Sequence, residues 1–255
     1  MKQHESVRAG GTGSRPAAAR RGTAGALAAA VVLVLVTSCT GADDGGPDGS
    51  RTGVPRDVAV SPADSPSATG PAGLAAKALK DGSVPRTKIT VPSDAEAPKA
   101  GDVTSDDRCG PLARAAAGAA LGSPEDTVVR RITGNGLVTT VTLASYGNER
   151  KAVDSLTGLS AAADDCTGGF TFRAVGKEHQ VTSAVRELAP QGADQAMGIG
   201  LTERAGTGKK ARKVVVMRRG ATVAVFTTTA TGKATPPGGL AVPPEVVGRQ
   251  VVALS

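Results

Sequence analysis

The stretch Ala152-Val-Asp-Ser-Leu-Thr-Gly-Leu-Ser-Ala-Ala-Ala-Asp-Asp-Cys-Thr-Gly-Gly-Phe170 gives the clearest secondary-structure signal in this chain. Its apolar residues recur every three or four positions, which predicts a helix with one buried face. The residues on that face are Val153, Leu156, Leu159, Ala163 and Cys166. A cysteine on a buried helix face suits a structural crosslink better than reactive chemistry.

Strand patterns lie on both sides of this helix in the sequence. Residues 127–133 and 137–146 alternate with a period of two around Gly134-Asn135-Gly136, which predicts a hairpin. Further strands are expected at 170–175, 180–188, 196–203, 214–218 and 222–229, and the last two flank a tight turn at Arg219-Gly220.

Three more helices and one edge strand complete the expected fold. The helices are a short one near 74–79, an Ala-rich one from Pro111 to Leu121 ended by Gly122, and a terminal one opened by Pro243-Pro244. The edge strand is expected at 87–91. Strands in hairpin succession, with helices between and after them, predict an α+β domain in which helices pack an antiparallel sheet.

The first 38 residues have the layout of an export signal. Arg15, Arg20 and Arg21 precede an uncharged run from Gly22 to Ser38 that ends in small residues. This run of 17 residues is short for a bilayer-spanning helix, which needs roughly 20, so a membrane anchor is the weaker interpretation. The adjacent arginines leave both the general and the twin-arginine export route open.

The four residues Val36-Thr37-Ser38-Cys39 resemble the lipobox of bacterial lipoproteins. The resemblance implies cleavage between Ser38 and Cys39 and acylation of the Cys39 thiol, for example with palmitate. The mature protein would then lie on the extracytoplasmic face of the cell membrane, held by its lipid anchor. An ordinary secretory signal followed by a chance cysteine is the alternative.

Two cysteines remain beyond Cys39, and we expect Cys109 and Cys166 to form a disulfide because an exported protein meets an oxidising compartment. In the chain-entropy model a crosslink over a loop of this length stabilises the fold by roughly 4 kcal/mol. A metal or nucleophilic site is less favoured, since two thiols without a nearby histidine make a weak zinc site. We therefore expect no metal and no cofactor.

Composition limits the classes of function. Removal of residues 1–38 leaves 25 basic and 22 acidic residues, so the net charge of +7 falls to +3 and does not indicate nucleic-acid binding. The chain has no Trp, one Tyr and three Phe, whereas sugar and base recognition relies on aromatic stacking. The stretch from residue 39 to 73 is rich in Gly, Pro, Ser and Asp, which predicts a lipidated disordered linker.

Several stretches within residues 74–255 together resemble a known family. They are 105–112, 141–146, 152–170, 214–218 and 244–254. They are similar to the extracellular sensor-like domain of PknH-type actinobacterial serine/threonine kinases, a domain that also occurs in actinobacterial lipoproteins. The resemblance implies an α+β sandwich with a ligand-binding cleft, and it supplies no catalytic motif. This chain differs in having one possible disulfide instead of two and no kinase domain.

Two basic features of the chain are candidate binding sites. Gly206-Thr-Gly-Lys-Lys210 lacks the spacing of a phosphate loop and is better interpreted as a hairpin loop. The cluster Lys209, Lys210, Arg212 and Lys213 suits anionic cell-wall polymers or lipid headgroups, but a solvated turn is the favoured interpretation.

A histidine and two aspartate pairs are candidate catalytic or metal-binding residues. His179 stands in a charged stretch without a nucleophile-elbow motif, so we expect a surface histidine. Two aspartate pairs, Asp106-Asp107 and Asp164-Asp165, each stand close before a cysteine in the sequence. A disulfide between these cysteines could therefore bring the carboxylates together. A cation site there is conceivable, and solvated helix ends are favoured.

The sequence thus predicts a membrane-anchored extracytoplasmic lipoprotein with a non-catalytic ligand-binding or sensor-like domain. Its expected partners are the membrane, through the lipid anchor, and a small-molecule or cell-envelope ligand, but not nucleic acid. The alternatives are a cell-envelope hydrolase and a structural envelope protein that binds a partner protein through its sheet.

The lipid anchor can be tested with Cys39→Ala. Because the cysteine thiol is the acylated group, the precursor is expected to stay uncut after Ser38 and to incorporate no labelled palmitate. Mass spectrometry of the N-terminus and metabolic acyl labelling, with the unchanged chain as control, measure both effects. Labelling that persists in the variant would contradict the lipoprotein interpretation.

Overall fold

The computed structural model describes residues 70–232 and 239–255. The signal-like stretch, Cys39 and nearly all of the expected linker lie outside the described residues. In chain order the elements are α1 (Pro71–Lys77), β1 (Lys88–Thr90), the 3-10 helix η1 (Ala100–Asp102), β2 (Thr104–Ser105), the 3-10 helix η2 (Asp107–Cys109), α2 (Gly110–Ala117), β3 (Asp126–Gly134), β4 (Leu137–Ser145), α3 (Glu149–Asp165), β5 (Phe170–Ala174), β6 (Lys177–Glu187), β7 (Gln195–Ala205), β8 (Gly208–Arg219), β9 (Thr222–Ala230) and α4 (Pro244–Ala253).

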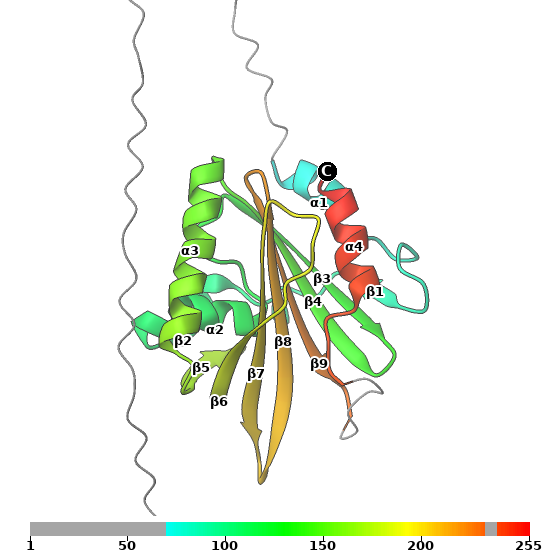
Figure 1. Cartoon of the computed structure of the whole chain (residues 1–255). Helices are drawn as coiled ribbons and strands as arrows, with labels where there is room; N and C mark the ends of the chain where they lie inside the picture. Colours follow the sequence, from blue (N-terminus) through cyan, green and yellow to red (C-terminus); the bar gives the residue numbers. More distant parts are fainter. Residues whose placement is uncertain (1–69, 233–238) are drawn as a thin grey trace, which may run out of the picture. The chain divides into compact units, whose positions relative to one another are not determined.

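A single twisted sheet forms the centre of the domain (Figure 1). Its nine strands follow the order β1-β3-β4-β9-β8-β7-β6-β5-β2, and all neighbours are antiparallel. Asn135 and Gly136 join β3 to β4 with φ values of 50° and 71°, as a tight two-residue hairpin turn requires. The expected α+β class, with an antiparallel sheet packed by helices, is confirmed.

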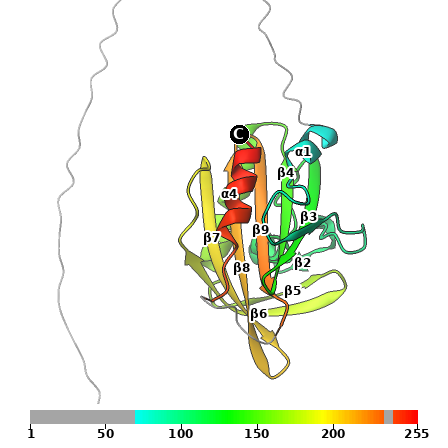
Figure 2. The ribbon, with the colours of Figure 1, turned by 90° about the vertical axis from the view of Figure 1, so that its right-hand side faces the viewer.

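Helices cover both faces of the sheet, and each face has its own apolar core (Figures 1 and 2). On the α2–α3 face, Val214 and Val216 of β8 join a cluster with the apolar residues of α2 and α3. On the α1–α4 face, Val215 and Met217 join a second cluster with α1 and α4. The alternating side chains of β8 therefore contribute to both cores, because successive residues of a strand point to opposite faces.

The expected disulfide joins Cys109, at the start of α2, to Cys166, just after α3. The two Cα atoms are 6.0 Å apart, and both cysteines belong to the core of the α2–α3 face. The crosslink therefore fixes one end of α2 against the end of α3 over the sheet.

Helix α2 is shorter than the sequence suggested: it ends at Ala117, not at Leu121. Gly118 adopts φ 76° and its N–H donates to Ala115 O, which ends the helix in a left-handed cap. The hydroxyl of Thr142 donates to Gly118 O at 2.6 Å, so β4 takes up the carbonyl left at this helix end.

Helix α3 also differs slightly from the expectation. Ala152 is fully buried and Val153 is only half-buried, so the buried face runs through Ala152, Leu156, Leu159 and Ala163. The buried face thus begins one residue earlier than the apolar periodicity indicated.

The disulfide can be tested with Cys109→Ser, Cys166→Ser and the double variant, all in the chain that begins at residue 40. Each change breaks the same crosslink, so we expect all three variants to lose about 4 kcal/mol of unfolding free energy rather than additive amounts. Denaturant titration measures the loss. Non-reduced peptide mapping that finds both thiols free in the exported chain would contradict the pairing.

Candidate functional site

A mainly apolar cleft of about 380 Å³ lies on the α1–α4 face, at the end of the sheet where β3 turns into β4. Three segments form its walls: the connection between α1 and β1, the β3–β4 hairpin, and the start of α4. Its main apolar lining residues are Val84, Pro85, Ile132, Leu137, Pro243 and Val246. Small-molecule sites commonly occupy roughly 300–1,000 Å³ and are mainly apolar, so this cleft has suitable size and chemistry.

One wall of the cleft is held against β3 by close backbone packing. A Cβ atom at Gly134 would lie 2.7 Å from the carbonyl oxygen of Arg86, so only glycine allows this approach. The hydroxyl of Thr87 donates to Val84 O at 2.9 Å and closes the same connection into a turn. The wall is therefore built into the fold and does not depend on a bound ligand.

The hydroxyl of Thr139, which is paired with that of Thr228, supplies a buried polar group at the cleft. Thr139 lines it, and the Oγ1 atoms of Thr139 and Thr228 are 2.8 Å apart, with both residues fully buried. Either hydroxyl can donate to the other, so one of the two hydrogens has no acceptor among the described residues. The pair therefore offers a donor and free lone pairs next to an apolar surface.

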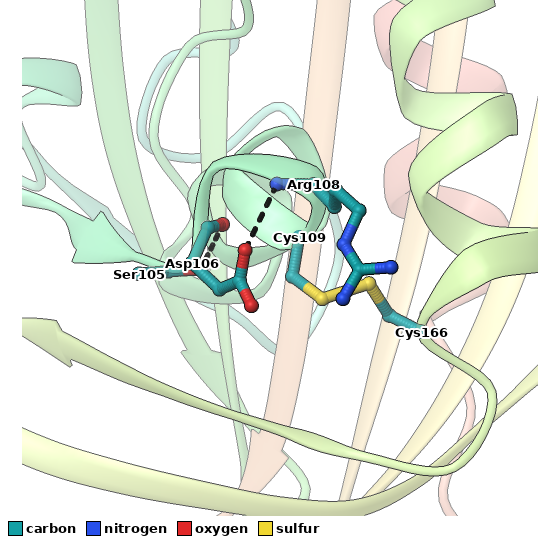
Figure 3. The surroundings of a disulfide bond; sticks show 5 residues. All are labelled: Ser105, Asp106, Arg108, Cys109 and Cys166. Atoms are coloured by element: carbon teal, nitrogen blue, oxygen red, sulfur yellow. Dashed lines mark hydrogen bonds between the residues drawn. A yellow bond between two sulfur atoms is a disulfide. The ribbon is translucent and has the colours of Figure 1, made fainter.

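The disulfide, shown with its neighbours in Figure 3, lies on the opposite face from this cleft. It borders a hollow of its own of about 360 Å³. Asp106 and Asp165 both line this hollow, but their pair-mates Asp107 and Asp164 do not. The Asp106 carboxylate accepts from the Arg108 N–H at 3.3 Å and so caps its own short helix. The disulfide therefore brings one residue of each pair together, not all four.

Asp164 is used elsewhere. Its Oδ1 accepts from Arg186 Nε at 2.7 Å, and the same guanidinium donates to Ser160. Within residues 70–232 and 239–255, no three His, Cys, Asp or Glu side chains are grouped as metal ligands.

His179 is half-buried, which corrects the expectation of a surface histidine. Its ring stacks on Phe172 with centroids 4.7 Å apart, and its Nδ1 atom is 3.5 Å from Glu203 Oε2. Glu203 also forms an ion pair with Arg212, whose guanidinium donates to Ala116 O at 2.7 Å. This group, here called the Glu203 cluster, ties the β7–β8 hairpin to the end of α2.

The Glu203 carboxylate is held in its charged form by its neighbours. Burial by itself would raise its pKa, but hydrogen bonds from His179 and Arg212 and the charges of both lower the pKa to about 2. A carboxylate so fully occupied by partners acts as a structural tie, not as a proton acceptor for a substrate.

The structure divides the basic cluster that the sequence suggested. Arg212 turns inward to Glu203, and Lys213 pairs with Glu187. The expected hairpin is present, but its turn is only Gly206-Thr207, and Lys209 and Lys210 lie exposed in the first residues of β8.

Sequence reasoning did not locate the cleft. Its walls come from segments far apart in the chain, and only the Asn135-Gly136 turn and the Pro243-Pro244 helix start marked two of them. The glycine at 134 was part of the hairpin signal, but its close contact with residue 86 is visible only in the structure.

No protein-family model and no curated protein matches this chain. Among solved structures, it is similar to the extracellular domain of PknH from Mycobacterium tuberculosis, with a TM-score of 0.45 and 9% identity over 72% of this chain and 94% of that one. It is also similar to an uncharacterized Mycobacterium smegmatis protein, the Rv0999 ortholog, with a TM-score of 0.39 and 15% identity over 67% of this chain and 90% of that one.

The Glu203 cluster can be tested with Glu203→Gln. Removal of the carboxylate leaves the poorly exposed Arg212 without its counter-ion, so we expect a loss on the order of 3 kcal/mol at neutral pH. The folded-state pKa is lowered from 4.5 to about 2, so the carboxylate's contribution is complete above 4.5 and is lost as the pH falls through about 2.

Denaturant titrations at several pH values should therefore show the stability difference shrink below pH 4.5. Asp164→Asn, which breaks the exposed pair with Arg186, is the control and should have a much smaller effect at neutral pH. A stability difference that does not change with pH would show that the carboxylate charge is not the cause.

Proposed function

We propose that this chain is a membrane-anchored extracytoplasmic lipoprotein whose α+β domain binds a small, mainly apolar envelope ligand without chemical turnover. The observation that carries the proposal is the preformed cleft on the α1–α4 face. It combines an apolar lining with the buried hydroxyl of Thr139, and such a combination binds an apolar body and orients one polar group.

The location rests on two features of the chain. The lipobox-like stretch ending at Cys39 supports export and acylation. The disulfide between Cys109 and Cys166 supports an oxidising compartment. Among the described helices, none has the length and apolar character needed to span a bilayer.

The polar groups of the cleft favour binding over catalysis. Those that line it are the side chains of Thr87, Asn135, Thr139 and Glu245, which form no pair of nucleophile and base. The carboxylates that a hydrolase would need have structural partners: Asp106 caps a helix and Asp164 binds Arg186.

The sheet edges do not favour the alternative of a structural protein that adds a partner strand. The sheet ends in β1, of three residues, and in β2, of two residues. Edge strands this short themselves offer few free backbone groups to an added strand. The longer uncovered stretch of β3, residues 126–130, lies against α1 and its connection, with Arg130 Nε donating to Leu79 O at 3.2 Å.

The cleft can be tested by filling it with Leu137→Trp. Leu137 is half-buried and lines the cleft, whereas the half-buried Val138 points to the opposite face and supplies the matched control Val138→Trp. In a thermal-shift screen of envelope lipids and metabolites, a ligand at about a hundred times its Kd should raise Tm by roughly 5–10 °C. We expect this shift in the unchanged chain and in Val138→Trp, but not in Leu137→Trp.

Two outcomes would contradict the proposal. The first is a ligand that stabilises Leu137→Trp as strongly as the unchanged chain, which would place binding outside the cleft. The second is turnover of peptidoglycan, ester or glycoside substrates that disappears in Asp106→Asn or Asp165→Asn, which would favour a cell-envelope hydrolase.

A further inference from the structure

The β7–β8 hairpin carries a group of exposed cations near its turn. Arg204, Lys209 and Lys210, here called the basic tip, are all exposed. Arg204 lies directly opposite Lys209 in the strand register. Like charges in this position destabilise a hairpin, so the fold gains nothing from placing them there.

Among residues 70–232 and 239–255, no acidic side chain forms an ion pair with the basic tip. Glu203 is directly opposite Lys210 in the register, but its carboxylate is taken up by Arg212 and His179. The Glu203 cluster thus positions the hairpin and leaves the three cations of the tip without an ion-pair partner in the described part of the chain.

The basic tip lies at the end of the sheet away from α1. Both views place α1 at one end of the domain and the β7–β8 turn at the other (Figures 1 and 2). The chain enters the described domain at Gly70, immediately before α1. The basic tip therefore lies at the end of the domain away from the residue at which the described chain begins.

We infer that the basic tip binds a linear, phosphate-bearing polymer of the cell envelope. Several exposed cations beside one hairpin turn can engage successive phosphates of a flexible chain at once. The release of counterions from such a polymer favours binding. Contact with an envelope polymer rests on the proposed extracytoplasmic location, but the chemistry of this surface does not depend on the cleft.

The inference can be tested on the chain that begins at residue 40, which retains both cores and the disulfide. The probe is long-chain inorganic polyphosphate, and the variant is the triple change Arg204→Gln, Lys209→Gln and Lys210→Gln. We expect the Kd of the triple variant for polyphosphate, measured at about 50 mM salt, to be about tenfold higher or more than that of the unchanged chain. The slope of log Kd against log salt should also fall by roughly one for each cation removed.

A matched control removes three exposed cations from the other end of the domain, with Lys80→Gln, Arg150→Gln and Arg249→Gln. Its Kd should stay within about twofold of the unchanged chain, since these cations lie far from the proposed contact. The tip variant should keep its Tm, because it removes the repulsion between Arg204 and Lys209. Loss of binding then cannot be attributed to unfolding.

Three results would overturn the inference. They are equal loss of binding in the tip and control variants, no binding of polyphosphate by the unchanged chain, and tighter binding to phosphatidylglycerol vesicles than to the polymer. Leu137→Trp, which fills the cleft, should bind polyphosphate like the unchanged chain. Failure of the cleft proposal and failure of the polymer proposal are therefore distinguishable.

Discussion

Burial of the central strands on both faces is the constraint on which the rest of the structure depends. Val214 and Val216 of β8 face one core, while Val215 and Met217 face the other. Such a strand is stable only if helices cover both sides of the sheet. Since the chain has few aromatic residues, both cores consist largely of Val, Leu and Ala, whose small side chains require the helices to pack closely.

Each helix pair is tied across its face by a different kind of interaction. On one face the disulfide joins the start of α2 to the end of α3. On the other, the buried side chain of Gln250 in α4 accepts from Leu79 N at 3.3 Å and donates to Lys77 O at 2.8 Å, and so satisfies the backbone just after α1. A buried polar side chain whose donor and acceptor both have hydrogen-bond partners holds the helices that it joins in a fixed register.

The two candidate binding surfaces follow from what these helices leave uncovered. Helix α4 begins beside the β3–β4 turn, so the end of the sheet next to it remains open as the apolar cleft. The β7–β8 turn lies away from the helices, at the other end of the domain from α1 (Figure 2). Glu203 and Arg212, two charged groups inside the fold, are occupied by one another, so neither is free to bind a ligand.

The sequence by itself determined the features set by near neighbours in the chain. These are the helix that ends before Cys166, the Asn135-Gly136 hairpin and the α+β class, since periodicity and turn chemistry act over a few residues. The tertiary structure alone decided that His179 stacks on Phe172, that Arg212 turns inward while Lys209 stays exposed, and that residues 84–87 pack on Gly134 to form the cleft. These outcomes depend on contacts between distant segments, such as Arg212 with Ala116, 96 residues apart, and no local pattern encodes them.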